Sequence, residues 1–423
     1  MSFSSFALRA ELLRAVHELG FVSPTAIQKD AIPAGLAGRD VLACSATGSG
    51  KTAAFLLPIL QRLAESPKGM TRALILTPTR ELAAQIGSHL AELGRYTNIR
   101  GAAVYGGVAM GPQRQALARG ADIIIATPGR LLDHMRQSYA RMPGLEILVL
   151  DEADRMLDMG FLPDIRRIIS QLPKVKQTFM FSATVPSEIV KLTREMLKDP
   201  ATINIGRESK PAAGITHSVY PVPHLLKSSL LLKLVQDDKI RNALVFARTK
   251  RRADRVADYL KRNGIAATRI HGDRTQGQRT QALEGFKSGH YRVLVATDVA
   301  ARGIDIDALS HVINFDLPGC SEDYIHRVGR TARAQAVGDA FTFVSPDQEG
   351  DLKAIERALS SRLPRVVIDD FDYSVKDLPQ TEGRPQHNSR KPQGQRGGRG
   401  PSRPWERSEW KPKQGKRFFA HAR

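Results

Sequence analysis

The sequence predicts an α/β protein with two parallel-sheet domains in tandem. Short apolar runs recur along the first half of the chain, and segments of helical period such as 53–64 and 81–93 separate them. Strands that are buried on both faces read as continuous apolar runs, and helices connect parallel strands. The pattern lapses around residues 205–214, and a second series of the same kind follows. We therefore expect two domains joined by a short linker.

The apolar runs give the expected strands and domain boundaries. In the first domain the expected strands are 41–43, 73–76, 123–126, 147–150 and 179–181, and in the second they are 243–246, 266–270, 293–296, 311–315 and 340–344. The first domain is expected over residues 1–206, the linker over 207–217, the second domain over 218–372 and a disordered basic tail over 373–423.

Composition favours a folded, basic, cytoplasmic protein. The chain has 423 residues, of which 42% are hydrophobic, and 63 Lys and Arg stand against 43 Asp and Glu, a net charge of +20. This charge favours nucleic acid as a partner over a merely solubilising surface. The two cysteines are in no metal-ligand spacing, and no apolar stretch is long enough to span a membrane.

The last 43 residues have a different composition. From Thr381 to Arg423 there are 12 Lys and Arg, 3 Glu, 11 Gly or Pro, and no Leu, Ile, Val or Met. Such a segment cannot bury enough apolar surface to offset its chain entropy, so we expect disorder. Trp405 and Trp410 lie among these arginines. The tail is expected either to bind single strands by stacking and charge or to act as a solubilising segment.

A phosphate-binding loop follows the first expected strand. Residues 45–52 read Ser-Ala-Thr-Gly-Ser-Gly-Lys-Thr between a strand and a helix. Backbone N–H groups and a helix N-terminus suit a triphosphate there, Lys51 would reach the β and γ phosphates, and Thr52 would ligate Mg²⁺. The usual pattern begins with Gly, whereas this chain has Ser45. Taken alone, the loop could therefore be a structural turn.

An acidic cluster at the end of another strand removes that ambiguity. Asp151-Glu152-Ala153-Asp154 follows the strand expected over 147–150. Open α/β sheets bind ligands at this edge. One carboxylate can hold Mg²⁺, and the next can orient or deprotonate the water that attacks the γ-phosphate.

These motifs and their order resemble those of the DEAD-box ATP-dependent RNA helicases. The resemblance extends from Phe3 to about residue 344, and the tail is most like that of the bacterial RhlE-like branch. The matching segments are 20–28 (Gly-Phe-Val-Ser-Pro-Thr-Ala-Ile-Gln), 78–82 (Pro-Thr-Arg-Glu-Leu), Gly106-Gly107, 127–130 (Thr-Pro-Gly-Arg), 182–184 (Ser-Ala-Thr), 296–305 and 326–333. The resemblance implies two RecA-like domains that close on ATP and RNA.

For the nucleotide site, the resemblance implies one set of residues in each domain. In the first domain Gln28 reads adenine, a role that its paired amide donor and acceptor suit. Phe3 packs near adenine, with a core phenylalanine as the alternative. The implied contacts are Phe3, Gln28, Ser45, Ala46, Thr47, Gly48, Ser49, Gly50, Lys51, Thr52 and Asp305, with Lys51, Asp151, Glu152, Arg330 and Arg333 as catalytic residues and Thr52 and Asp151 on the metal.

The second domain has no phosphate loop of its own. The resemblance places Asp305 by the ribose, and we expect Arg330 and Arg333, at i, i+3 spacing on one helix, to act as arginine fingers across the interdomain cleft. His326 is expected to support the closed interface.

For RNA, the resemblance implies backbone contacts and low sequence specificity. The implied residues are Pro78, Thr79, Arg80, Gly107, Thr127, Arg130 and Thr297. Glycine allows close backbone approach, and hydroxyl and guanidinium groups suit phosphates. Ser182 and Thr184, hydrogen-bonded toward Asp154, are expected to link the ATP state to duplex separation.

The function that these observations predict is ATP hydrolysis coupled to local separation of short RNA duplexes or remodelling of RNA–protein complexes. The alternatives are a non-enzymatic RNA-binding or annealing protein, which the intact Lys51, Glu152 and Arg330 disfavour, and a DNA translocase, which only the resemblance disfavours. Ribosomal or RNA-decay proteins are candidate partners. The sequence gives no basis for the RNA substrate or the oligomeric state.

Overall fold

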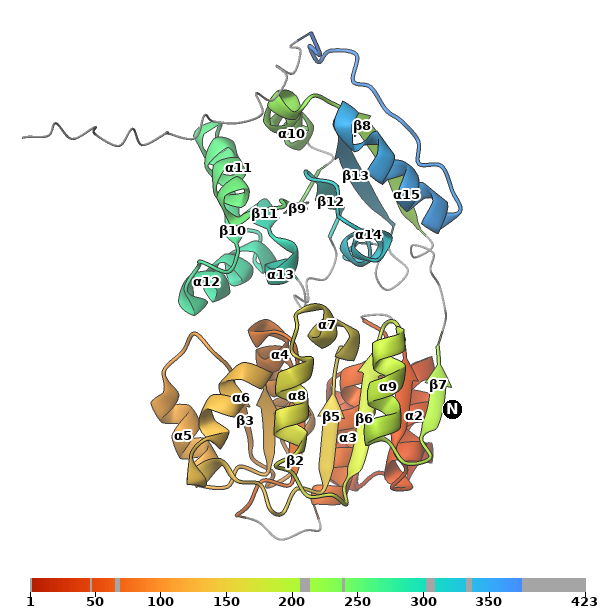
Figure 1. Ribbon diagram of the computed structural model, residues 1–423, viewed down its shortest axis with the longest axis vertical. Helices are drawn as coiled ribbons and strands as arrows, with labels where there is room; N and C mark the ends of the chain where they lie inside the picture. The colour runs from red at the N-terminus through yellow and green to blue at the C-terminus, as the bar shows by residue number, and fades with distance from the viewer. Residues whose placement is uncertain are drawn as a thin grey trace, which may run out of the picture. The chain divides into compact units, whose positions relative to one another are not determined.

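In the computed structural model of the protein, the described residues are 2–45, 48–64, 69–205, 214–237, 240–301, 309–331 and 337–374. They form two parallel β-sheets, each covered by helices, which confirms the predicted fold class (Figure 1). The calls on Ala46, Thr47, Asp305 and Arg333, and on the tail from residue 375 onward, lie outside the described residues.

The first sheet has seven strands among the described residues, in the order β3-β4-β2-β5-β6-β1-β7. Its strands are β1 (Val41–Cys44), β2 (Ala73–Leu76), β3 (Gly101–Val104), β4 (Ile123–Ala126), β5 (Ile147–Leu150), β6 (Gln177–Ser182) and β7 (Ala201–Asn204). Its helices are α1 (Ala10–Glu18), α2 (Ala26–Leu36), α3 (Lys51–Leu63), α4 (Arg80–Leu93), α5 (Met110–Ala118), α6 (Pro128–Met135), α7 (Ala153–Asp158), α8 (Leu162–Ile169) and α9 (Ser187–Met196).

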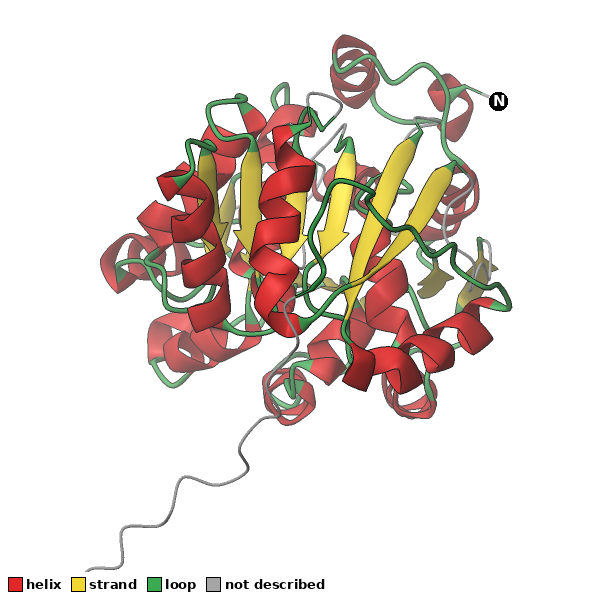
Figure 2. Ribbon diagram, turned by 90° about the horizontal axis from the view of Figure 1, so that it is seen from above, coloured by secondary structure: helices red, strands yellow, loops and turns green. Residues whose placement is uncertain are grey.

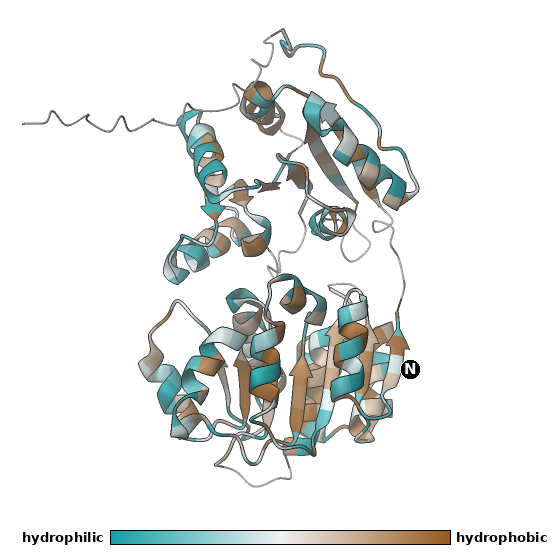
Figure 3. Ribbon diagram, viewed as in Figure 1, coloured by the Kyte–Doolittle hydropathy of each residue, from teal (hydrophilic) through white to brown (hydrophobic). Residues whose placement is uncertain are grey.

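Alternate residues of the internal strands pack into two separate cores. Val149 and Phe179 pack with residues of α1 to α4 on one face, whereas Leu148 and Met180 pack with residues of α5 to α9 on the other. The four central strands β2, β4, β5 and β6 are buried at every position, as expected for a parallel sheet that is covered on both sides. Figure 3 shows the resulting apolar strands between helices with polar outer faces.

The second sheet has six strands among the described residues, in the order β10-β11-β9-β12-β13-β8. Its strands are β8 (Ile215–Pro221), β9 (Ala243–Phe246), β10 (Ala267–Ile270), β11 (Val293–Ala296), β12 (His311–Asn314) and β13 (Gly338–Val344). Its helices are α10 (Lys227–Gln236), α11 (Lys250–Arg262), α12 (Gln276–Lys287), α13 (Asp298–Ala301), α14 (Ser321–Val328) and α15 (Glu349–Leu359). Figure 2 shows helices on both sides of the strands.

Every strand that the sequence predicts is present within two residues, but three strands at sheet edges were not expected. They are β3, β7 and β8, of which β3 and β7 are partly exposed and therefore lack a continuous apolar run. Because β8 begins at Ile215 and pairs with β13, residues 215–217 of the expected linker are part of the second sheet. The described helices include none that is both long and apolar enough to cross a membrane.

Candidate active site

The side chain of Lys51 contacts the residue that follows β1. Lys51, the first residue of α3, is buried, and its Nζ donates to the carbonyl of Ser45 at 3.1 Å. The hydroxyls of Ser45 and Ser49 lie 2.9 Å apart. Gly50 has φ +93°, a conformation that L side chains rarely adopt, so the sharp turn into α3 requires glycine there. Thr52 follows on the first turn of α3.

Gln28 on α2 ties this loop to the preceding segment. Its Nε2 donates to the Gly50 carbonyl at 3.1 Å, and its Oε1 accepts from the backbone N–H of Thr25 at 2.9 Å. An amide has two N–H groups and two acceptor lone pairs, so Gln28 keeps one of each for a ligand. Phe3 is buried, with its ring centroid 5.9 Å from that of Phe6 and 6.0 Å from that of Phe21.

The pKa values of the two carboxylates at the end of β5 are shifted in opposite directions. Burial raises the pKa of Asp151 to about 6, although Lys51 opposes this shift. Burial also acts to raise the pKa of Glu152, but the cations Arg155, first, and Lys51, next, outweigh it and hold that pKa below its ordinary value. Glu152 therefore stays ionised in the interior of the protein.

Asp154 connects the ends of β5 and β6, which are neighbouring strands. Its Oδ2 accepts from the backbone N–H groups of Ala183 and Thr184 at 3.0 and 2.7 Å, and from the Thr184 hydroxyl at 3.0 Å. The Ser182 hydroxyl accepts from the Asp154 N–H at 3.3 Å and donates to the Thr184 carbonyl at 2.6 Å. The acidic cluster and residues 182–184 therefore form one hydrogen-bonded unit.

A second group of predicted residues gathers at the ends of β2, β3 and β4. The Thr79 hydroxyl caps α4 by accepting from the Leu82 N–H at 3.3 Å. The Arg80 guanidinium packs so closely on Gly107 that a Cβ there would lie 1.9 Å from Nη1. Arg130 donates to the carbonyl of Val108 at 3.0 Å, beside that glycine. Pro78 and Thr127 occupy the strand ends between them, and both are buried.

In the second domain the described site residues lie in two places, directly after β11 and at the end of α14. Thr297 follows β11 and His326 is on α14. Arg330 is not on this helix, contrary to the expectation of two arginines on one helix face. The helix ends at Val328, with Gly329 as its C-cap, and Arg330 lies in the following turn, where its N–H donates to the Arg327 carbonyl. Thr331 forms an isolated bridge with Leu309.

The sequence analysis assigned no role to Arg155. Its guanidinium Nη1 lies 2.7 Å from Oε2 of Glu152, and both side chains are buried. The i, i+3 spacing from Glu152 was a signal for this contact, but the same spacing is common for solvated pairs on helix surfaces.

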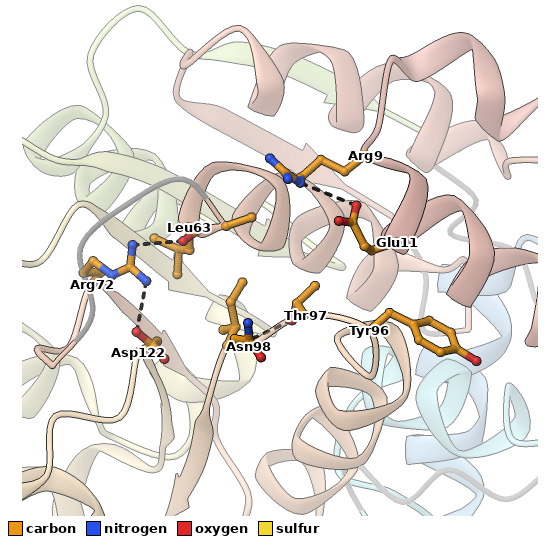
Figure 4. A pocket seen from close by; sticks show the side chains of 10 residues that line it. Arg9, Glu11, Leu63, Arg72, Tyr96, Thr97, Asn98 and Asp122 are labelled. Carbon is orange, nitrogen blue, oxygen red and sulfur yellow. Dashed lines mark hydrogen bonds and ion pairs between the residues drawn. The ribbon is translucent and has the colours of Figure 1, made fainter.

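A polar cavity of about 130 Å³ lies at the opposite edge of the first sheet, among the residues that precede β2, β3 and β4 and the ends of α3 and α4. Figure 4 shows Arg72 paired with Asp122 and with the Leu63 carbonyl, and Arg9 beside Glu11. The charged groups that line it are paired with one another, so the cavity presents no net formal charge.

Comparison with known proteins identifies close relatives. The DEAD/DEAH box helicase profile matches residues 25–192, and the helicase conserved C-terminal domain profile matches residues 226–335. DEAD-box ATP-dependent RNA helicase CshA of Bacillus subtilis is 40% identical over 376 residues, 89% of this chain and 76% of CshA. ATP-dependent RNA helicase RhlB of Pseudomonas syringae is 42% identical over 370 residues, 85% of this chain and 93% of RhlB.

Two solved structures are also similar to this chain. S. cerevisiae Dbp5 bound to RNA and ADP BeF3 has a TM-score of 0.79 and 32% identity, over 86% of this chain and 95% of that chain. Mss116p bound to single-stranded RNA and AMP-PNP has a TM-score of 0.78 and 27% identity, over 86% of this chain and 79% of that chain. The finer resemblance to the RhlE-like branch stays a prediction.

Proposed function

This chain belongs to the DEAD-box family of ATP-dependent RNA helicases, and from that premise we propose how its residues divide the work. ATP is bound and hydrolysed at the carboxyl edge of β1, β5 and β6, and RNA lies along the carboxyl edge of β2, β3 and β4. The observation that carries this proposal is the strand order, which gathers the two sets of residues at two adjoining parts of one sheet edge.

Lys51 and the loop before it hold the triphosphate. Nζ of Lys51 leaves the Ser45 carbonyl and binds the β and γ phosphates, while the N–H groups at the start of α3 face the same charge. Gln28 uses its remaining amide donor and acceptor on the adenine edge. Gln28 is already attached to the phosphate-binding loop, because its amide donates to the carbonyl of Gly50.

Thr52 and Asp151 would hold Mg²⁺. The described residues contain no cluster of three or more His, Cys, Asp and Glu side chains that could hold a metal. Mg²⁺ bound through one or two protein oxygens, phosphates and water does not need such a cluster. The raised pKa of Asp151, about 6, is that of a buried carboxylate without a full counter-charge, which a divalent cation would supply. The ion, when bound, neutralises charge on the phosphate oxygens.

Glu152 orients and activates the attacking water. Its carboxylate is held ionised by Arg155 and Lys51, so it can accept a hydrogen bond from water at neutral pH. Arg330 and Arg333 then stabilise the charge on the transferring phosphoryl group, and Asp305 holds the ribose.

RNA phosphates are bound by Arg80, Arg130, Thr79 and Thr127, and Pro78 and Gly107 permit close approach of the strand. Thr297 adds a contact from the second domain. These groups read the backbone rather than base edges, so sequence specificity is low. Asp154, Ser182 and Thr184, with His326, transmit the state of the nucleotide to the RNA side. The hydrogen bonds that join Asp154 to residues 182–184 support this coupling.

The cytoplasm, where ATP and RNA occur together, is the proposed location, and ribosomal or RNA-decay proteins stay the candidate partners. The test is ATP hydrolysis by the full chain with no nucleic acid, single-stranded RNA, duplex RNA or matched DNA. We expect stimulation by both RNAs and little by DNA. Equal rates in all four conditions would contradict the proposed RNA dependence.

A further inference from the structure

Arg155 is a buried cation directly beside the proposed water-activating carboxylate. We propose that Arg155 is a positioning residue for hydrolysis, which holds Oε2 of Glu152 so that Oε1 is left to accept a hydrogen bond from the attacking water. The inference rests on the role of Glu152 proposed above. Arg155 itself touches neither nucleotide nor water in this assignment.

The backbone at Glu152 is unusual and fixes one end of its side chain. Glu152 has φ +54° and ψ +52°, the left-handed conformation, and it is the residue before α7 rather than a residue within it. A non-glycine residue rarely adopts this conformation, which persists only where its surroundings hold it.

Arg155 fixes the other end. Its Nη1 lies 2.7 Å from Oε2, a short, charge-assisted hydrogen bond between side chains on the same turn of the chain. With the backbone set at one end and the guanidinium at the other, the carboxylate has little freedom to rotate. This rigidity is the property that a water-positioning group requires.

The pairing uses only one of the two carboxylate oxygens. Within the described part of the chain, Oε2 accepts from Arg155 and no hydrogen bond reaches Oε1. A bidentate contact, which arginine forms readily with carboxylates, would have occupied both oxygens. The monodentate geometry therefore keeps Oε1 available.

A purely stabilising ion pair is the weaker explanation. Arg155 is 2% exposed and Glu152 is 6% exposed, and pairs this deeply buried contribute little net stability because desolvation offsets the attraction. In addition, Nη2 of Arg155 is buried and has no hydrogen-bond partner among the described residues. An arginine retained for packing would be better satisfied.

The test uses the full-length protein with saturating single-stranded RNA and measures kcat, KM for ATP, and affinity for a fluorescent ADP. We expect Arg155→Gln to lower kcat by about 10- to 100-fold, with KM and ADP affinity changed by less than about twofold. Arg155→Lys, which keeps a cation at shorter reach, should restore part of the loss. Arg166→Gln removes an exposed arginine that pairs with Glu195 on the same domain, and it should leave all three values unchanged.

A double variant distinguishes an effect of Arg155 that acts through Glu152 from a general disruption of the structure. If Arg155 acts through Glu152, adding Arg155→Gln to Glu152→Gln should change the residual single-turnover rate by less than twofold. A kcat within twofold of the unaltered protein for Arg155→Gln, or equal losses of kcat and ADP affinity, would overturn the inference. If Arg155→Gln does not fold, Arg155→Lys decides the question by the same split between kcat and affinity. Full turnover by Glu152→Gln would instead refute the proposed role of Glu152 itself.

Discussion

Arg72 and Asp122 form an ion pair in the interior of the first domain, at the edge of the sheet opposite the active site. Nη2 of Arg72 lies 3.0 Å from Oδ1 of Asp122, and Nη1 donates to the Leu63 carbonyl at 3.1 Å. The second oxygen of Asp122 accepts from the Arg100 N–H at 2.9 Å. The exposed fractions of the two paired side chains are 2% and 0%. Removal of one partner therefore leaves a buried charge without its counter-charge.

We expect Arg72→Met to lower the free energy of unfolding by about 3–5 kcal/mol, since Asp122 is then charged, buried and unpaired. Urea unfolding followed by circular dichroism measures the change. A second substitution, Asp122→Asn, removes that charge and keeps an acceptor for the Arg100 N–H, so the double variant should recover more than half of the loss.

The matched control for this pair is on the surface. Arg166 and Glu195 lie 2.7 Å apart, but both are about half exposed, and Arg166→Met should cost no more than about 1 kcal/mol. If Arg72→Met were no more destabilising than Arg166→Met, the ion pair between Arg72 and Asp122 would not matter for stability.

At the scale of elements, the loop between β1 and α3 depends on one glycine. A Cβ added at Gly50 would lie 2.5 Å from Nε2 of Gln28 and 3.0 Å from the Thr25 hydroxyl, at a backbone φ of +93°. Gly50→Ala should therefore displace Gln28 and distort the start of α3. We expect at least a tenfold loss of affinity for fluorescent ADP, measured by titration.

Gly111 is the control for this substitution. It lies inside α5, and an added Cβ would have nothing within 4 Å, so Gly111→Ala should leave ADP affinity unchanged and stabilise the helix slightly. Unchanged ADP affinity in Gly50→Ala would mean that the loop adapts and that the contact with Gln28 is dispensable.

Helix α10 carries a fully buried lysine. Nζ of Lys227 donates to the Phe343 carbonyl at 3.3 Å and to Oε1 of Gln348 at 2.9 Å. Burial lowers its pKa from 10.5 to about 8, against the opposing effect of Asp316. Between about pH 8 and 10.5 the unfolded chain therefore binds more protons at this site than the folded chain, so deprotonation on raising the pH stabilises the fold.

The expected result is a contribution from Lys227 to the unfolding free energy that rises by up to about 1.4 kcal/mol per pH unit above pH 8. Lys227→Met should remove this slope, as seen by urea unfolding at several pH values from 7 to 9.5. Lys233→Met on the same helix, where the lysine is exposed and pairs with Asp370, should keep it. The same slope in all three proteins would show that Lys227 does not titrate in this range.

The elements also show what sequence patterns can and cannot predict. Central strands such as β2 and β5 have four apolar residues and were predicted at their observed bounds, because both faces are buried. Edge strand β3 was not, because its exposed Gly101 breaks the apolar run. The helix expected to carry Arg330 and Arg333 ends at Val328, and the Thr331 hydroxyl and backbone pair with Leu309, a contact far away in sequence.

The same distinction applies to the candidate site. That Lys51 and Asp151 lie at one edge of the sheet could be predicted from the sequence, because parallel strands end on the same side of a sheet. The sequence analysis assigned no role to Arg155, because the i, i+3 spacing from Glu152 is common for solvated pairs on helix surfaces, and only the fold shows that both side chains are buried. Nor could it predict that Arg80 packs on Gly107, since Arg80 comes after β2 and Gly107 after β3, and β4 lies between these two strands in the sheet.

At the scale of the whole molecule, the residues proposed for hydrolysis and RNA binding end at Arg333, whereas much of the positive charge lies beyond them. Residues 381–423 contain 12 Lys and Arg against 3 Glu, so they carry +9 of the net +20. Binding to RNA releases counterions in proportion to the phosphates that are neutralised. The tail should therefore add affinity without adding chemistry.

Truncation after Gln380 tests whether the tail contributes to RNA affinity and not to catalysis. We expect the RNA concentration for half-maximal stimulation of ATP hydrolysis to rise and the dependence of RNA affinity on salt to become shallower, while turnover at saturating RNA stays within about twofold of the full-length value. Trp405→Ala with Trp410→Ala is the matched control, because loss of stacking, about 1–3 kcal/mol per base, should weaken binding without changing the salt slope. Equal RNA affinity of the truncated and full-length proteins at 50, 150 and 300 mM salt would contradict the electrostatic role. The charge of the tail would then serve solubility or another partner, and RNA affinity would rest on the two folded domains alone.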